Sequence, residues 1–377
     1  MKLRFLHTAD WHIGKKLNGF DLLTDQRAII DQILALAVTE QVDAVVVAGD
    51  LYDRAVPGVD AVNLFNEKII AFNLENKLPL LTIAGNHDSC ERLNFGTPWF
   101  SKTNFYLHTE LAQAFQPVEI ADTQFFLLPY FEPFSARLYF KDDSIKTLND
   151  AMKKIVAEME KKFDSAKRQI LVAHFFAAGS SKSESETKIM VGGLDSVAVD
   201  LLSSFDYVAL GHLHNHHALD HPSIQYSGAP LKYAISEENQ TKGVYIVDTN
   251  DFSRTFYPLT PKHDVRTITA SYEELLSPAF YQAVDCEDFL QIQLTDRGVI
   301  ANLMNQLRAI YPRLLGISRL HQIQQESQLH KLQKRKDTPE EIVHDFFTEM
   351  TSETLTLSQE KWLTKGLQIA AKFDESK

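Results

Sequence analysis

The sequence predicts an α/β protein that carries a smaller α/β unit and terminal helices, and three observations lead to this prediction. Short apolar runs alternate with amphipathic helical patterns over the first two thirds of the 377 residues. Near residue 265 the pattern changes to a shorter series of strands and helices. A polar stretch then precedes two apolar helical segments. Continuous apolar strands separated by helices are typical of a well-buried sheet with helices on its faces.

The first part of the chain contains the apolar runs that we interpret as buried strands. They are residues 3–9, 42–50, 78–86, 123–130, 168–175, 205–212 and 243–248. Two segments, residues 24–38 and 61–75, repeat apolar residues at helical spacing. Such a period predicts helices with one buried face. The polar stretch at residues 179–193 is typical of a mobile surface loop.

The later part of the chain divides into three segments. We therefore expect a main domain at 1–262, followed by a capping domain at 263–322, a polar linker at 323–337 and a helical segment at 338–377. In the capping domain we expect strands at 265–270, 288–295 and 313–323, with helices at 271–283 and 299–311. Ser271 and Glu274 form the capping-box pattern that begins a helix. In the last segment, Thr338 and Pro339 begin one helix, and residues 358–373 form another.

Composition excludes several classes of protein. Hydrophobic residues make up 44% and charged residues 23%, as in an ordinary globular protein. A net charge of −12 argues against a module that coats nucleic acid by charge alone. Two cysteines exclude a disulfide framework or zinc fingers. We find no apolar run of membrane-spanning length and no signal peptide before the first strand, so we expect a cytoplasmic protein without a membrane span.

Polar side chains follow the strongly apolar runs, where the predicted strands end. They are Asp10 and His12, Asp50 and Asp53, Asn86 with His87 and Asp88, His174, and His212 with His214. Each group alone fits a simple turn. In α/β sheets, however, ligands bind beyond the carboxyl ends of strands. Because imidazoles and carboxylates recur at this level along the chain, we favour a metal site over a repeated coincidence of turns.

The number and chemistry of the candidate ligands predict two metal ions. The candidates are Asp10, His12, Asp50, Asn86, His174, His212 and His214. This set is larger than one ion takes from protein, and Asp50 can bridge two. Imidazole, carboxylate and amide together suit Mn²⁺ or Fe²⁺, with Mg²⁺ or Zn²⁺ as alternatives. Two ions about 3.5–4 Å apart form the clamp used in phosphoester hydrolysis.

Other histidines receive simpler interpretations. His216, His217 and His221 extend the run after the predicted strand at 205–212. We expect them on a solvated or DNA-facing loop rather than at a third metal. His7 lies within the first predicted strand, and we expect it to pack in the core.

The motifs in chain order resemble the signature of the calcineurin-like metallophosphoesterases. They are Asp10-x-His12, GDLYD at 49–53, GNHD at 85–88, His174 and GHLH at 211–214. The resemblance implies a four-layer α/β sandwich. Within that superfamily the chain is similar to nuclease subunits that process DNA breaks together with an ATPase. The opening FLHTADWHIGKKLNGFDLLTDQ carries that similarity, which extends over nearly the whole chain.

The resemblance also implies roles for the site residues. One ion would take Asp10, His12, Asp50 and His214, and the other would take Asp50, Asn86, His174 and His212. His87 would be catalytic, acting on the scissile phosphate as a general acid rather than as a ligand. Asp88 would orient neighbouring groups. Some relatives have histidine at the position of Asp53, so we assign no catalytic role there.

The activity implied by the resemblance is that of a Mn²⁺-dependent DNA nuclease. It would be an exonuclease on duplex ends and an endonuclease on single strands and hairpins, acting as a homodimer bound to an ATPase partner through residues 338–377. The helical region after Asp53 and residues 90–95 are the expected dimer surface. Two alternatives stay open: a small-molecule phosphodiesterase or phosphatase, and a non-catalytic scaffold that binds DNA ends.

Overall fold

A computed structural model describes residues 3–181, 196–298, 300–320, 343–344, 347 and 355–374. Most of the loop expected at 179–193 therefore lies outside the described residues. So do the linker expected at 323–337 and most of the helix expected to begin at Thr338.

Two β-sheets form the centre of the first part of the chain. The first has the strand order β13-β12-β1-β4-β5-β6, and the second has the order β11-β10-β9-β8-β7. Strands of the first sheet are β1 (Arg4–Thr8), β4 (Ala44–Val47), β5 (Leu80–Ile83), β6 (Phe105–His108), β12 (Gly243–Asp248) and β13 (Arg254–Pro258). Strands of the second sheet are β7 (Val118–Ile120), β8 (Thr123–Leu128), β9 (Arg168–His174), β10 (Tyr207–Gly211) and β11 (Ile224–Tyr226). Every apolar run that was predicted to be a strand contains a strand in the structure.

The two sheets pack face to face through a continuous apolar layer. Phe5 of β1 meets Phe125 of β8 with ring centroids 5.5 Å apart. The same buried cluster joins Val46 of the first sheet to Val172 and Ala209 of the second. Side chains of a strand point alternately to opposite faces, so the neighbours of Val46 on β4 point outward. The runs are apolar throughout because both faces of each sheet are buried.

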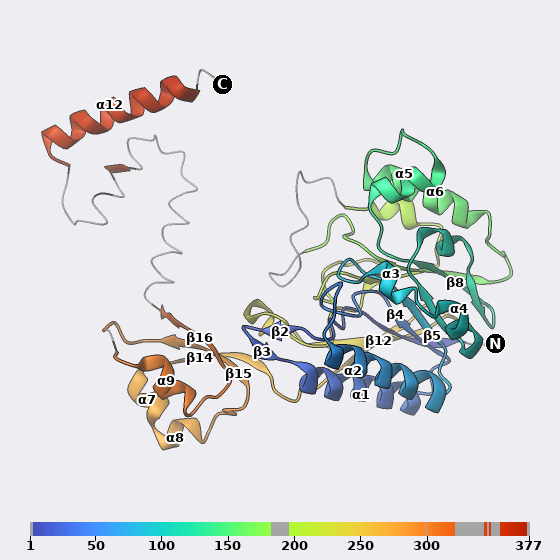
Figure 1. The fold of residues 1–377 in the computed structure, drawn as a ribbon, viewed down its shortest axis with the longest axis horizontal. Coiled ribbons are helices and arrows are strands. Elements are labelled where there is room, and N and C mark those ends of the chain that lie inside the picture. The colour runs from blue at the N-terminus through green and yellow to red at the C-terminus, as the bar shows by residue number, and fades with distance from the viewer. Residues whose placement is uncertain are drawn as a thin grey trace.

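Helices cover the outer faces of both sheets and complete four layers (Figure 1). Helices α1 (Leu23–Thr39) and α2 (Val59–Ile69) share a buried cluster with Val45 and Val47 of the first sheet. Helices α5 (Pro133–Phe140) and α6 (Leu148–Glu160) share another with β8 and β9. The helix predicted at 61–75 is divided, because α2 continues as a π-helical turn, η1 (Ile70–Glu75). The expected four-layer sandwich is confirmed.

A small parallel sheet follows, in the order β14-β15-β16. Its elements are β14 (Val265–Ala270), α7 (Tyr272–Leu276), α8 (Pro278–Tyr281), β15 (Phe289–Leu294), α9 (Leu303–Arg308) and β16 (Leu314–Arg319). Ser271 and Glu274 form the expected capping box. The predicted helix at 271–283 is interrupted, because Ser277 is extended before Pro278. This unit has its own apolar core, although Phe289 also packs into the core of the first part.

The remaining described elements are short, except for one helix near the C-terminus. They are β2 (Lys16–Leu17), β3 (Phe20–Asp21), α3 (Cys90–Leu93), α4 (Thr97–Phe100), η2 (Ser101–Thr103), η3 (Leu111–Phe115), η4 (Val199–Leu202), η5 (Ile235–Glu237) and α12 (Leu357–Asp374). Helix α12 matches the helix expected at 358–373, and its Trp362 is 79% exposed. None of the helices among the described residues has the length and apolarity to cross a bilayer. The expected domain boundaries stay predictions.

His7 should make the fold sensitive to acid. It is fully buried on β1, as expected, and burial lowers its pKa to about 3. The unfolded chain takes up this proton near pH 6.5, so stability should fall as the pH drops from about 6.5 towards 3. Replacing His7 by Asn should flatten the dependence of unfolding free energy on pH by up to about 1.4 kcal/mol per pH unit. Urea titrations at several pH values measure this.

Equal slopes in His7→Asn and the unmodified protein would contradict the prediction.

Candidate metal centre

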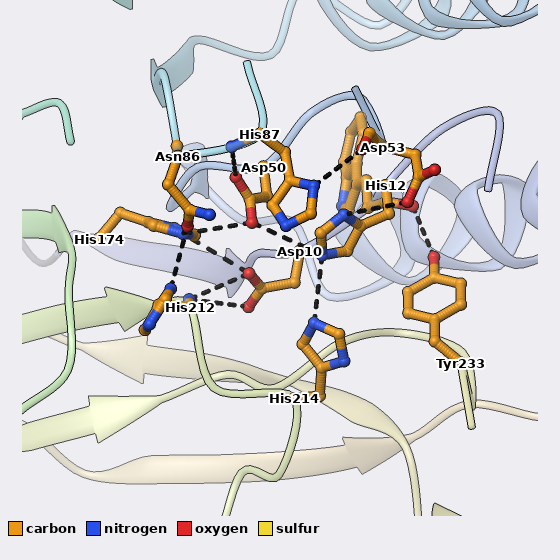
Figure 2. A network of polar contacts seen from close by, with 12 residues as sticks. Asp10, His12, Asp50, Asp53, Asn86, His87, His174, His212, His214 and Tyr233 are labelled. Carbon is orange, nitrogen blue, oxygen red and sulfur yellow. Dashed lines mark hydrogen bonds and ion pairs between the residues drawn. The ribbon is translucent and has the colours of Figure 1, made fainter. Parts of the chain in front are cut away.

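The seven predicted ligands lie together where the carboxyl ends of the two sheets meet (Figure 2). Asp10 and His12 follow β1, Asp50 follows β4, and Asn86 follows β5, all in the first sheet. His174 ends β9, and His212 and His214 follow β10, both in the second sheet. Carboxylates and an amide from one sheet thus face imidazoles from the other. The packing of the sheets creates the site.

One group of candidate ligands contains Asp10, His12 and His214, whose donor atoms lie within 4.8 Å of one another. All three residues are buried. The Nε2 atoms of His12 and His214 are 3.1 Å apart, so the two rings turn the same nitrogen towards a common point. Imidazole nitrogens bind metal ions such as Zn²⁺ at about 2.0–2.1 Å, so one ion fits between these atoms.

A second group contains Asp10, Asp50 and His174. The Oδ1 atom of Asn86 lies 2.9 Å from Nε2 of His174 and 3.0 Å from Nδ1 of His212. The Nδ1 atom of His174 lies 2.8 Å from the backbone oxygen of Ala48. A proton on Nδ1 donates to that oxygen, so Nε2 is the nitrogen that faces Asn86 and Asp50 and would bind a metal ion.

Asp50 lies between the two groups. Its Oδ2 atom is 3.6 Å from Nε2 of His12 and 3.3 Å from Nε2 of His174. Its Oδ1 atom accepts a hydrogen bond of 2.9 Å from the backbone N–H of His87. This carboxylate can therefore reach an ion on either side.

The backbone is strained at four of these residues. Asp10, His12, Asp50 and His212 have positive φ angles of 53°, 44°, 51° and 93°. Non-glycine residues adopt such angles rarely, at a cost of about 1–3 kcal/mol each. Strain of this kind is found at functional sites, where the surrounding structure imposes it. The concentration of four such residues here supports a functional centre.

Glycines permit the close approach of the strand ends. A Cβ atom on Gly85 would lie 2.2 Å from Oδ1 of Asp50. A Cβ atom on Gly49, whose φ is +89°, would lie 2.4 Å from Nδ1 of His174. Neither position accepts a side chain without moving a candidate ligand.

Buried negative charge makes the site a receptor for cations. Burial, together with the nearby charge of Asp50, raises the pKa of Asp10 to about 6 against the opposing charge of His174. Burial also opposes ionisation of Asp50, but the charge and hydrogen bond of His174 bring the pKa of Asp50 well below its usual range. Two carboxylates removed from water in this way require positive charge beside them.

The donor set fits divalent metal ions. It combines buried carboxylate oxygens, an amide oxygen and imidazole nitrogens, and it has no thiolate. Such mixed sets hold Mn²⁺, Fe²⁺ or Zn²⁺. The clustering of histidine and aspartate in this fold therefore indicates divalent metal binding.

Three neighbouring residues lie beside the candidate ligands. His87 stands edge-on to His12, with ring centroids 4.7 Å apart, and its Nδ1 atom lies 2.8 Å from the backbone oxygen of Asp53. The carboxylate of Asp53 accepts from Lys15 at 2.8 Å. Asp88 accepts backbone N–H groups of Leu51, Tyr52 and Gly85, so it joins the loops that follow β4 and β5.

The expectation for His216 is wrong. This side chain is buried, not solvated, and it stacks on Phe256 with ring centroids 4.1 Å apart and an interplanar angle of 8°. Its Nδ1 atom also lies 2.9 Å from the hydroxyl of Tyr245. The loop after β10 turns back over β12 and β13, which a sequence motif does not reveal. His217 is exposed, as expected.

The sequence interpretation also missed residues behind the ligands. Glu237 contacts His214, and Lys242 contacts Glu237. Gln26 donates to the backbone oxygen of His12 at 2.7 Å. The hydroxyl of Tyr233 donates to the backbone oxygen of Trp11 at 2.5 Å. None of these residues follows a strongly apolar run, which was the signal used to find the ligands.

Comparison with known proteins gives two family matches and several related structures. Residues 3–216 match the calcineurin-like phosphoesterase family, and residues 261–351 match the family described as type 5 capsule protein repressor C-terminal domain. Among solved structures, a Thermus thermophilus protein and a dimetal phosphatase from Danio rerio each share 13% identity over 68% of the chain, with TM-scores of 0.43 and 0.40. The matches cover 99% of the Thermus thermophilus chain and 96% of the Danio rerio chain.

The chain belongs to the calcineurin-like phosphoesterases, and as such it is a metal-dependent phosphodiesterase. Within them it belongs to the SbcD family. It is 36% identical to the SbcD subunit of nuclease SbcCD from Staphylococcus epidermidis, over 95% of this chain and 96% of that protein. It is also 36% identical to the corresponding SbcD protein from Staphylococcus saprophyticus, over 96% and 97%.

Gly85→Ala should disrupt metal binding without removing a ligand. The new Cβ atom would collide with Asp50, so the loop or the carboxylate must move and the affinity for divalent ions should fall at least 10-fold. Titration of metal-free protein with Mn²⁺ against a competing chelator measures this. Gly58→Ala is the matched control, because no heavy atom lies within 4 Å of its Cβ position. Unchanged affinity in a folded Gly85→Ala variant would contradict the prediction.

Proposed function

We propose that this protein is a two-metal DNA nuclease, with Mn²⁺ as the best activating ion. The proposed activities are exonuclease cleavage of double-stranded ends and endonuclease cleavage of single strands and hairpins. The proposed setting is cytoplasmic DNA repair and recombination with an SbcC ATPase. The observation that carries the proposal is the convergence of seven buried or half-buried ligands from two sheets on one strained, negatively charged centre.

The proposed ligand sets divide the donors between two ions. Asp10, His12 and His214 would hold one ion. His174 of the second group, with Asn86 and His212 beside it, would hold the other. Asp50 would bridge them, since it lies within 3.6 Å of a histidine nitrogen from each set. When bound, the two ions would neutralise the phosphate oxygens and supply an activated water.

His87 is the proposed general acid. Its Nδ1 proton donates to the backbone oxygen of Asp53, which fixes the ring beside the ligands. The opposite ring nitrogen would then deliver a proton to the leaving oxygen of the sugar. The backbone N–H of His87 bonds to Asp50, so the acid and the proposed bridging ligand keep a fixed relation. General acid catalysis typically contributes 10²–10⁴-fold.

Replacing His87 by Ala should leave both ions bound and lower the rate of cleavage by about 10²–10⁴-fold. The assay uses Mn²⁺ with a hairpin DNA, a duplex with free ends and a small phosphodiester, and metal analysis accompanies it. Loss of one ion from the variant would make His87 a ligand and contradict its proposed role.

The same assay separates the alternatives. Cleavage of the small phosphodiester alone would favour the phosphodiesterase class. No cleavage of any substrate by metal-loaded protein would favour a scaffold. A DNA nuclease is preferred because the relatives that share nearly the whole chain, the small unit included, are named as nuclease subunits.

The proposed assembly contains two copies of this chain. Large apolar side chains are exposed on α2 and η1, where Val59 is 75% and Leu74 55% exposed, and near α4, where Phe95 is 83% and Trp99 72% exposed. Soluble monomers seldom gather such groups, so a second copy is a suitable cover. Trp99→Glu should shift sedimentation from dimer to monomer. Phe134→Glu, which alters an exposed residue on α5, should not. A dimeric Trp99→Glu variant would contradict this surface.

The SbcC-binding segment is proposed at residues 338–377. Its described helix α12 exposes Trp362, and a helix with a large exposed aromatic side chain suits docking onto another protein. The coiled-coil base of SbcC is the proposed partner surface. Docking onto this chain's own small α/β unit is the alternative.

Deletion of residues 338–377 should leave a folded, metal-loaded enzyme that still cleaves single strands. It should weaken co-purification with SbcC and abolish ATP-dependent cleavage of duplex ends. Trp362→Glu in the full chain is the smaller change and should weaken the same association. A deletion variant that binds SbcC at full strength, or that fails to fold alone, would contradict the proposal.

A further inference from the structure

The two nitrogens of the His214 ring face different surroundings. Nε2 lies 3.1 Å from Nε2 of His12, within the candidate metal centre. Nδ1 lies 3.4 Å from Oε1 of Glu237, behind the centre. His214 is 2% exposed and Glu237 is fully buried, so water does not compete for this contact. The ring thus joins the centre to a carboxylate that is not a candidate ligand.

Glu237 is itself held by further contacts. It ends the short turn η5, and its Oε2 atom lies 2.6 Å from Nζ of Lys242. The same Nζ donates to the backbone oxygen of His214 at 2.9 Å and to Oε1 of Gln240 at 2.8 Å. Oε2 of Glu237 also accepts from the backbone N–H of Tyr233 at 3.2 Å. His214, Glu237 and Lys242 therefore form a closed circuit, in which the lysine returns to the histidine that the glutamate contacts.

The contacts of Glu237 assign a role to each of its two oxygens. Oε2 meets Nζ of Lys242 and the backbone N–H of Tyr233, which leaves Oε1 facing Nδ1 of His214. A carboxylate oxygen accepts hydrogen bonds, so in a neutral His214 ring the proton lies on Nδ1 and is donated to Oε1. The lone pair of Nε2 then points into the centre. A histidine binds metal in this form, and its other nitrogen commonly donates to a carboxylate or a carbonyl.

We propose that Glu237 is a positioning residue, which fixes the tautomer and the orientation of His214 so that Nε2 faces the metal centre, and that Lys242 holds Glu237 in place. This inference rests on the proposed two-metal function and adds a residue that acts through a ligand rather than on the substrate. His174 supports it by comparison, because its Nδ1 atom meets the backbone oxygen of Ala48 in the same relation. At His214 a side chain performs this task, so mutation can remove it.

The competing explanation is purely structural. Glu237 and Lys242 join η5 to the start of β12, and a buried ion pair between two segments can contribute to folding alone. The chain offers a matched control for that explanation. Asp25 is a buried carboxylate that lies 2.7 Å from Nδ1 of His263, a histidine that is not a candidate ligand. Removing Asp25 also breaks a carboxylate–histidine pair, here with a half-buried histidine, but neither residue is a candidate ligand.

The experiment compares Glu237→Ala, Glu237→Gln and Asp25→Ala with the unmodified protein. Mn²⁺ binding is measured by competition with a chelator, and the tautomer of His214 is read from ¹⁵N NMR of the metal-free, histidine-labelled protein. We expect Glu237→Ala to bind one of its two ions about 10–100-fold more weakly, the usual loss when such an outer partner is removed. The other ion should bind as before. Glu237→Gln keeps an acceptor and should recover part of the affinity.

The NMR measurement supplies a readout that stability alone does not change. The unmodified protein should show His214 with its proton on Nδ1, and Glu237→Ala should show a mixture of tautomers. Asp25→Ala should keep both the tautomer and the affinity, even if its melting temperature falls.

The proposal fails if Glu237→Ala keeps the Nδ1–H tautomer and both affinities. It also fails if Asp25→Ala loses the same affinity as Glu237→Ala, since lost stability would then explain both. If Glu237→Ala does not fold, Glu237→Gln decides by the same two measurements. Failure of the proposed function has a different signature: unmodified protein that binds Mn²⁺ but cleaves no DNA contradicts the nuclease function alone, and unmodified protein that binds no Mn²⁺ contradicts the metal centre. In that event the tautomer still tests whether Glu237 orients His214.

Discussion

The structure depends on one electrostatic constraint: two carboxylates from one sheet are buried against imidazoles from another. Asp10 and Asp50 are shielded from water where the carboxyl ends of the sheets meet. The histidines at the ends of β9 and β10 provide part of the polar surroundings that water would otherwise give. Four candidate ligands have positive φ angles, and Gly49 and Gly85 admit side chains at contact distance. These features oppose stability, so the apolar core between the sheets must sustain them. A cation removes the main cost, the buried negative charge.

The surroundings of the centre extend this principle from ligands to their supports. His174 is oriented by a backbone oxygen, His87 by that of Asp53, and His214 by Glu237. A backbone oxygen is placed by the fold and carries no net charge. The carboxylate of Glu237 adds a buried negative charge, which Lys242 compensates. His12 differs from the others, since its buried Nδ1 atom has no hydrogen-bond partner among the described residues and lies 3.9 Å from Asp53.

Much of this architecture could be predicted from the sequence, because apolar runs mark strands and polar residues mark their ends. That reasoning found the strands and the seven candidate ligands. It could not show that β1 and β10 belong to different sheets that face each other. The expectation of two facing sheets came from the family resemblance. It missed Glu237 because no local pattern links a residue in a short turn to a histidine 23 positions earlier. It misjudged His216 because stacking on Phe256 depends on tertiary packing.

The central claim is that the strand ends form a single centre for two ions that share Asp50. The most direct measurement is the binding of Mn²⁺ to metal-free protein, followed by atomic analysis and by electron paramagnetic resonance. The account predicts two ions per chain with a spin-coupled spectrum, as expected for ions about 3.5–4 Å apart. A folded protein that binds one ion, or two ions without magnetic coupling, would contradict it.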